Sequence, residues 1–206
     1  MPRPSRPGLP VRYLRVSSQG YTPPMPTVLY EVHDAIATLT LNRPEVLNAL
    51  NLEMRDELWS ALDAIWADED VGVVVLRGAG DRAFCAGADL TEFGTTPSYD
   101  AARRARLGRD LWGRLLHYPK PLIAVIHGWA LGAGCEMSLL CDLRLASDDA
   151  RFGLPETSLG YLPTAGGSQT LPRIVGPGRA LDMVLSAEPI DAAHALECGL
   201  VHWTGP

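Results

Sequence analysis

Two carboxylates stand out in this sequence because small and apolar residues surround them. Glu136 ends the stretch "HGWALGAGCE" at residues 127–136, and Glu156 follows a proline in "GLPETSLG" at residues 153–160. Burial raises the pKa of a carboxyl group toward the range in which it can act as an acid or base near neutral pH. Two such groups at one site could transfer a proton to one atom and activate a water molecule beside it.

Each candidate also has a simpler interpretation. Glu136 lies where a helix should begin and could merely complement the helix dipole, and Glu156 lies in a turn and could be an exposed cap. The apolar neighbours of Glu136 favour a buried carboxylate. Cys135 beside it could be a nucleophile, but no histidine is close in sequence to activate it, so a buried structural thiol is the favoured interpretation.

Two glycine- and alanine-rich segments could supply the rest of such a site. They are "FCAGADL" at residues 84–90 and "HGWALGAGCE" at residues 127–136, and each follows an apolar, strand-like run. Small side chains let a ligand approach the backbone, and two N–H groups that converge there would form an oxyanion hole. Tight packing of a strand against a helix would demand the same small residues, so both explanations stay open at this point.

The elements that must position these groups alternate between strands and helices. Strands are predicted around a turn at residues 33–34 and within residues 71–80, 121–128 and 143–147, with a strand-like run at residues 199–203. Helices are predicted at residues 51–70, 100–119, 135–142, 178–188 and 191–199, the first with Asn51 as N-cap. Its apolar face should hold Leu52, Leu58, Leu62, Ile65 and Trp66. This alternation predicts an α/β fold with right-handed crossovers.

Composition narrows the function classes. The formal net charge of −6 and pI near 5.3 give no electrostatic footprint for nucleic acid, and no apolar run suits a membrane span. Four cysteines without regular spacing favour reduced thiols and a cytoplasmic protein. "GAGDRA" at residues 78–83 resembles a dinucleotide fingerprint, but "FCAGADL" follows it where a helix would be needed. Residues 1–24, rich in proline and arginine, precede a domain predicted at residues 25–206. They are interpreted as a disordered tail or a start assigned too early, in preference to an organelle transit peptide, whose amphipathic helix the prolines disfavour.

From about Met25 onward the chain resembles the enoyl-CoA hydratase/isomerase (crotonase) family. The matching runs include "LNRPEVLNALN", "FCAGADL", "KPLIAVIHGWALGAGCEMSLLCDLRLAS" and "RFGLPETSLGYLPTAGGSQTLPRIVG". The resemblance implies a crotonase-like spiral of ββα and βαβ units that assembles as a homotrimer or a dimer of trimers. Relatives continue with C-terminal helices, which this chain lacks after "GLVHWTGP". An exposed apolar patch near Val201 and Trp203 and a lower stability are therefore expected.

The same resemblance implies roles for individual residues. The N–H groups of Ala88 and Ala133 fall on the oxyanion hole, and Glu136 and Glu156 fall on the two catalytic glutamates of the hydratases. Asp89 matches a family residue that is interpreted as structural, and residues 91–100 match a mobile acyl-pocket loop. The remaining substrate- and CoA-binding positions, counted together with Asp89, are Val46, Leu47, Ala49, Ala86, Gly87, Leu90 and Gly132.

The function implied is that of an enoyl-CoA hydratase, a lyase of fatty acid metabolism. It would add water reversibly to a 2-trans-enoyl-CoA, with no cofactor or metal beyond the CoA of the substrate. Alternatives are a Δ3,Δ2-enoyl-CoA isomerase or another chemistry of the family, and a non-catalytic subunit that binds acyl-CoA. The sequence does not specify the acyl chain length.

Overall fold

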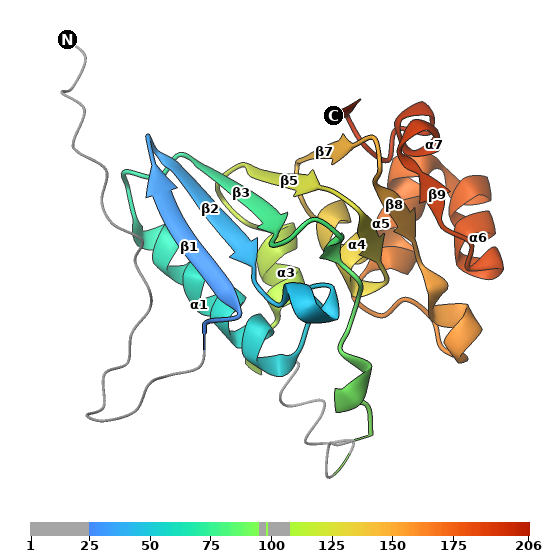
Figure 1. Cartoon of the computed structure of the whole chain (residues 1–206), viewed down its shortest axis with the longest axis horizontal. Coiled ribbons are helices and arrows are strands. Elements are labelled where there is room, and N and C mark those ends of the chain that lie inside the picture. The colour runs from blue at the N-terminus through green and yellow to red at the C-terminus, as the bar shows by residue number, and fades with distance from the viewer. Residues whose placement is uncertain (1–24, 95–97, 99–107) are drawn as a thin grey trace.

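The computed structural model describes residues 25–94, 98 and 108–206. The predicted tail and half of the predicted acyl-pocket loop lie outside the described residues. Within them the chain forms two sheets (Figure 1). The larger sheet has the order β1 (Val28–His33), β2 (Ile36–Leu41), β3 (Val73–Gly78), β5 (Leu122–Ile126), β7 (Leu143–Ser147), β10 (Trp203–Gly205). The smaller sheet has the order β4 (Ala83–Cys85), β6 (Trp129–Leu131), β8 (Arg151–Gly153), β9 (Ile190–Asp191).

Successive units of the chain add one strand to each sheet. The pairs β3–β4, β5–β6 and β7–β8 each run from the larger sheet to the smaller one, and β2, β3, β5, β7 and β10 are joined by parallel pairing. Helices follow these pairs: α3 (Leu111–Leu116), α4 (Ala133–Leu139) and α5 (Gly167–Val175). This repeated order confirms the predicted spiral of ββα units.

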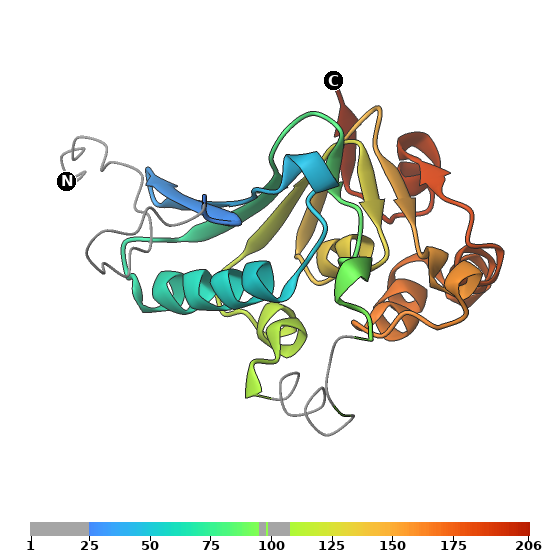
Figure 2. The same cartoon turned by 60° about the horizontal axis from the view of Figure 1, so that its bottom comes forward.

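The main core lies between the larger sheet and α1 (Leu52–Ala67), which runs beneath the sheet beside α3 (Figure 2). Asn51 caps α1 as predicted, since its side chain accepts a hydrogen bond from the N–H of Met54 at 2.9 Å. The predicted buried face is correct for Leu58, Leu62 and Ile65. It is wrong for Leu52 and Trp66, which are 53% and 57% exposed although Met54 and Ile65 near them are fully buried. At about 100° of rotation per residue, Leu52 and Trp66 fall outside the stripe of α1 that faces the core.

Several predicted boundaries differ from the structure. Among the described residues, the helix predicted at 100–119 is found mainly as α3. The chain turns before Asp110, and the Asp110 carboxylate accepts the N–H of Gly113 as an N-cap, so α3 begins there. The helix predicted at 135–142 begins two positions earlier, at Ala133. Helix α5 and the short strands of the smaller sheet were not predicted from the sequence. Pro172 inside α5 and strands of two or three residues leave no readable periodicity.

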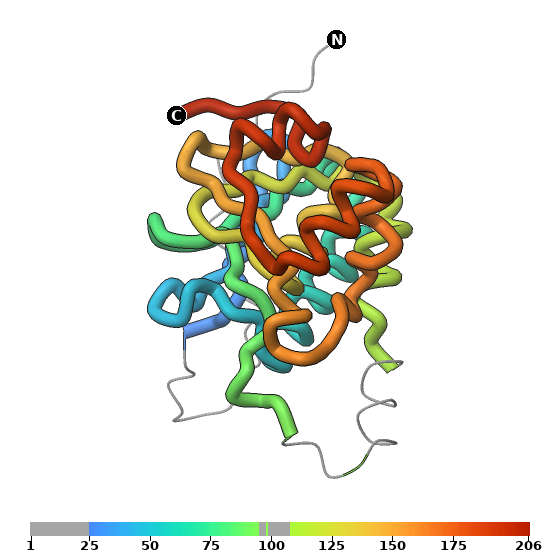
Figure 3. Tube along the Cα trace, turned by 90° about the vertical axis from the view of Figure 1, so that its right-hand side faces the viewer, coloured from blue at the N-terminus to red at the C-terminus, as the bar shows by residue number. Residues whose placement is uncertain are grey.

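The C-terminal part of the chain holds α6 (Pro177–Ser186), α7 (Ala192–Glu197) and β10, drawn in red in Figure 3. Helix α6 packs on α5, whereas α7 packs beside β9 and β10. The strand predicted at residues 199–203 begins instead at Trp203, which pairs with Leu145 of β7. Val201 is buried because the chain turns back under α7, and its N–H donates to the carbonyl of Ala195 at 3.2 Å. The prediction of an exposed patch is therefore wrong for Val201, whereas Trp203 is 52% exposed.

Candidate active site

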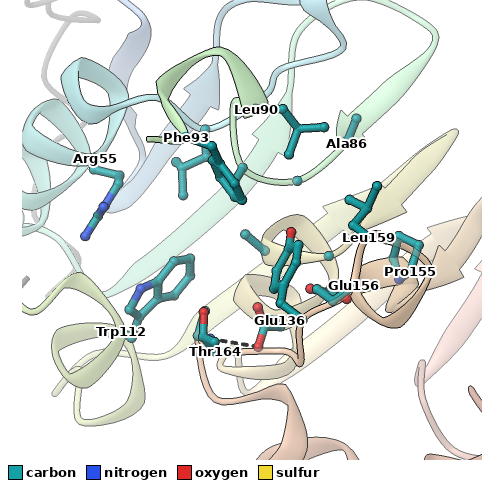
Figure 4. A pocket seen from close by; sticks show the side chains of 17 residues that line it. Arg55, Ala86, Leu90, Phe93, Trp112, Glu136, Pro155, Glu156, Leu159 and Thr164 are labelled. Carbon is teal, nitrogen blue, oxygen red and sulfur yellow. Dashed lines mark hydrogen bonds between the residues drawn. The ribbon is translucent and has the colours of Figure 1, made fainter. Parts of the chain in front are cut away.

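A pocket of about 270 Å³ lies where the ends of β4 and β6 meet the turn after β8. Glu136 and Glu156 line it together, so the fold brings the two carboxylates to one place from positions twenty residues apart (Figure 4). The rest of the lining is mainly apolar and comes from α1, η2 (Leu90–Glu92), α3 and the segment after η3 (Pro155–Leu159). The lining residues are Leu50, Arg55, Ala86, Gly87, Ala88, Leu90, Phe93, Trp112, Gly132, Ala133, Glu136, Pro155, Glu156, Leu159, Tyr161, Thr164 and Ala165.

The backbone N–H groups predicted to form an oxyanion hole face this pocket. Ala88 follows β4, and Ala133 is the first residue of α4, where the N–H groups have no intrahelical acceptor. No hydrogen bond between described residues takes the N–H of Ala88 or of Ala133. Two unpaired donors in a mainly apolar pocket are suited to an oxygen atom of a ligand that carries negative charge.

The two donor segments can approach each other because glycines stand at their contacts. Gly87 has a φ of +113°, and a Cβ there would lie 3.2 Å from the carbonyl oxygen of Leu131. A Cβ on Gly134 would lie only 2.1 Å from the carbonyl oxygen of Cys85, so α4 begins directly against β4. Both explanations of the small residues, tight packing and an oxyanion hole, therefore apply. The small residues permit tight packing, and this packing places the two N–H groups in one pocket.

Glu136 lies on α4 and is 2% exposed. Its Oε1 accepts hydrogen bonds from the N–H of Ala165 at 2.9 Å and of Gly167 at 2.7 Å. Charge-assisted hydrogen bonds of this kind stabilise negative charge and fix the carboxylate in one orientation. A Cβ at Gly167 would lie 2.9 Å from this oxygen, so the glycine leaves room for the carboxylate. Glu136 does more than complement a helix dipole, because its side chain is built into the pocket wall.

Glu156 is also buried, at 4% exposed, which excludes the alternative of an exposed cap. It lies on η3, and its Oε2 has no hydrogen-bond partner among the described residues. The pKa of Glu156 is raised to about 7: burial is the main cause, a hydrogen bond from its own backbone N–H lowers it, and the negative charge of Glu136 adds to the rise. Gly132 lies against Oε1, where a Cβ would come within 3.1 Å. Glu156 can therefore exchange a proton near neutral pH.

Other predicted binding residues divide into two groups. Ala86, Gly87, Leu90 and Gly132 line the pocket, whereas Val46, Leu47, Ala49 and Asp89 do not. The second group lies directly beside the first, because the N–H of Ala86 donates to the carbonyl of Leu47 at 3.0 Å and that of Asp89 to the carbonyl of Leu50 at 3.0 Å. The Asp89 carboxylate pairs with Arg43 at 2.9 Å and caps η2, which agrees with its structural interpretation.

Nine of the lining residues were not named from the sequence as site residues, although Phe93 lies within the predicted acyl-pocket loop. Four of them have large side chains. Arg55 comes from α1, Trp112 from α3, and Phe93 and Tyr161 from the two segments that face each other across the pocket. The rings of Phe93 and Tyr161 are tilted, with centroids 5.8 Å apart. Among these four, Arg55 alone carries a sequence signal that could have marked it as a candidate site residue. It is a cation near the N-terminus of a helix, where it opposes the helix dipole.

The cysteines do not contribute a nucleophile to this pocket. Cys135 is fully buried and is not among the residues that line the pocket, and burial raises the pKa of its thiol to about 12. Cys85 and Cys141 are buried in the same way. This confirms the structural interpretation of Cys135. The described residues contain no cluster of three histidine, cysteine, aspartate or glutamate side chains that could hold a metal ion, and no helix among them could cross a membrane.

Comparison with known proteins places this fold and pocket in a family. The family model described as enoyl-CoA hydratase/isomerase matches residues 31–206. The chain belongs to the enoyl-CoA hydratase/isomerase family, as the resemblance in its sequence implied.

Individual relatives agree with this assignment. The short-chain-enoyl-CoA hydratase of Clostridium acetobutylicum is 42% identical over 175 residues, which span 85% of this chain and 67% of that protein. The 2,3-dehydroadipyl-CoA hydratase of Escherichia coli is 47% identical over 166 residues, 81% of this chain and 64% of that protein. A crystal structure of an enoyl-CoA hydratase from Bacillus anthracis superimposes with a TM-score of 0.81 at 39% identity, covering 87% of this chain and 70% of that one. The matched region thus spans about two thirds of these relatives.

Proposed function

We propose that this protein is an enoyl-CoA hydratase, which adds water reversibly across the double bond of a 2-trans-enoyl-CoA to give a 3-hydroxyacyl-CoA. The observation that carries the proposal is the pair of buried carboxylates, Glu136 and Glu156, in one pocket with two free backbone N–H groups. The family membership and the names of its relatives support the same reaction.

The thioester oxygen would bind the N–H groups of Ala88 and Ala133. As water adds to C3, electrons of the double bond move toward the thioester, and negative charge develops on that oxygen. Donors that are already in place stabilise this enolate-like charge without reorganising, which lowers the activation free energy. The pocket therefore activates the double bond through its backbone rather than through a charged side chain.

The two glutamates would divide the proton transfers. Glu136, whose carboxylate is fixed by the N–H groups of Ala165 and Gly167, orients the water and accepts its proton as the C–O bond forms at C3. Glu156, with a pKa near 7, gives a proton to C2. The net change is one water molecule added once the proton taken up by Glu136 is released and Glu156 is reprotonated, by exchange with solvent, before the next turnover. The reaction is redox-neutral and both protons have carriers, so we propose no cofactor or metal beyond the CoA of the substrate.

Substitution of each glutamate tests the proposal. Glu136→Gln and Glu156→Gln should each lower kcat for crotonyl-CoA hydration by about two or more orders of magnitude, a typical contribution of general acid–base catalysis. Hydration is followed by loss of the enoyl-thioester absorbance, and binding of a saturated acyl-CoA should survive in both variants. Near-normal turnover by a folded Glu136→Gln protein would rule out the hydratase mechanism. Isomerisation of a 3-enoyl-CoA without hydration of crotonyl-CoA would favour the isomerase instead.

Assembly of this protein as a homotrimer or a dimer of trimers stays a prediction.

A further inference from the structure

One wall of the pocket carries a cation that the proposed hydration does not use. Arg55 lies in the first part of α1, is half-buried, and lines the same pocket as the two glutamates. The ion pairs and side-chain hydrogen bonds between described residues do not include its guanidinium. The neighbouring carboxylate on α1 is already paired, since Asp56 binds Arg109 at 2.9 Å.

The side chains around Arg55 make this position unusual. Leu50, Leu90, Phe93 and Trp112 line the same pocket and offer no carboxylate. The Glu92 carboxylate lies at the start of α1 and is already bound there, because it accepts the N–H of Leu52 at 3.0 and 3.1 Å. The position near the helix N-terminus also disfavours a cation, because the helix dipole is positive at that end. A guanidinium that is held in an apolar wall against the local dipole gains most when an anion joins it. The two glutamates cannot be that anion in the proposed mechanism, because Glu136 is bound to backbone N–H groups and Glu156 serves as proton donor.

The arrangement of the pocket indicates which part of a substrate would reach Arg55. In Figure 4, Arg55 and Trp112 lie on one side of the carboxylates, whereas Ala86, Pro155 and Leu159 lie on the other. Ala86 is hydrogen-bonded to residue Leu47, in the segment assigned to CoA binding. If the thioester lies between Ala88 and Ala133 with CoA on the Ala86 side, the acyl tail extends toward Trp112 and Arg55.

We propose that Arg55 is a specificity-determining residue that selects enoyl-CoA substrates with a carboxylate at the far end of the acyl chain. Such substrates are monothioesters of dicarboxylic acids. The methylene groups of the tail would contact Phe93 and Trp112, and the terminal carboxylate would pair with the guanidinium, which can donate two parallel hydrogen bonds. This inference rests on the proposed function for the chemistry at the double bond, but it concerns binding of the tail.

A competing role for Arg55 is to bind a phosphate group of CoA. That role would strengthen binding of every acyl-CoA by the same factor, whatever the tail carries. The proposed role strengthens binding only when the tail ends in a carboxylate. The ratio of two affinities, with the CoA part held constant, therefore separates the two roles.

The experiment measures dissociation constants by calorimetry for hexanoyl-CoA and adipoyl-CoA, which differ only in a terminal methyl or carboxylate and which are not hydrated. The wild-type protein should prefer adipoyl-CoA, and Arg55→Met should reduce the preference by about tenfold or more, as expected for a charge-assisted hydrogen bond in a partly buried site. Arg55→Lys should retain part of it. The matched control is Arg179→Met, which removes an exposed arginine of α6 that pairs with Glu197, and should keep the wild-type preference.

Each other outcome is decisive as well. If Arg55→Met loses affinity for both ligands by the same factor, the proposal is overturned in favour of a phosphate contact. If neither affinity changes, Arg55 makes no contact with the tail. Hydration of the matching pair of trans-2-enoyl-CoA substrates is measured separately. A preference for the carboxylated tail in binding, without hydration of either substrate, would sustain the role of Arg55 and refute the proposed reaction.

Discussion

The two carboxylates of the pocket are the same residue type in two contrasting surroundings. Glu136 lies on a regular helix, and one of its oxygens accepts hydrogen bonds from two backbone N–H groups, that of Ala165 just before α5 and that of Gly167 at its first position. Glu156 follows a proline in a short 3-10 helix, and one of its oxygens is buried without a hydrogen-bond partner among the described residues. Both are almost completely buried, so burial alone does not distinguish them.

This contrast shows how one amino acid can fill two catalytic roles. Hydrogen-bond donors around a carboxylate favour its charged form, and burial without donors favours its neutral form. The groups that surround Glu136 are suited to a base that holds water, and those that surround Glu156 to an acid that keeps its proton near neutral pH. The role of each glutamate therefore depends on the hydrogen-bond donors that the fold supplies to it. Substitutions that change the surroundings of one glutamate test this assignment.

The largest effect is expected from Gly167→Ala, which acts on the Glu136 side. A methyl group there would lie 2.9 Å from Oε1 and from Cγ of Glu136, so the carboxylate must move. A catalytic group that is misplaced by about 1 Å can lower the rate about 10²-fold, so kcat for crotonyl-CoA hydration should fall by about this factor. The control is Gly178→Ala on α6, where a new Cβ meets no atom within 4 Å. Full activity in folded Gly167→Ala protein would mean that the fixed position of Glu136 is not needed.

The stability of the protein should report the raised pKa on the Glu156 side. This pKa rises from 4.5 to about 7 on folding, so between these pH values the folded state binds more protons than the unfolded state. The free energy of unfolding should therefore fall as pH rises through this window, by at most about 3 kcal/mol. Glu156→Gln removes the titration. It should match the wild type near pH 4 and exceed its stability near pH 8 in denaturant unfolding, by an amount on the order of 1–3 kcal/mol. An identical pH dependence in both proteins would contradict the burial effect.

A smaller and more specific effect is expected in the pH dependence of turnover. If Glu156 must carry a proton to give it to C2, kcat for hydration should decline about tenfold for each pH step of one above an apparent pKa near 7. Steady-state rates from about pH 5 to 9 give the profile. A flat profile across neutral pH, in protein that stays folded, would reassign the proton donor. A decline that persists in the residual activity of Glu156→Gln would attribute it to another group.

Much of the fold was predictable because its central elements obey simple periodicities. The strand predicted at residues 143–147 coincides with β7, and Asn51 caps α1 as expected. Predictions failed where other forces outweigh local pattern. Helix α5 contains Pro172, the strands of the smaller sheet are too short to alternate, and Leu52 and Trp66 are apolar residues that fall outside the buried stripe of α1. These features depend on neighbours that are distant in sequence.

The sequence by itself determined the chemical groups of the site: two glutamates, and two glycine-rich segments that leave backbone N–H groups accessible. Residue types and spacing suffice for this, because glycine and alanine act locally on the backbone that carries them. Only the tertiary structure decided how the two glutamates differ, since the donors to Glu136 come from Ala165 and Gly167, some thirty residues along the chain. It alone also placed Arg55 and Trp112 in the pocket wall. Burial and electrostatic environment arise from packing of distant segments, and no local pattern encodes them.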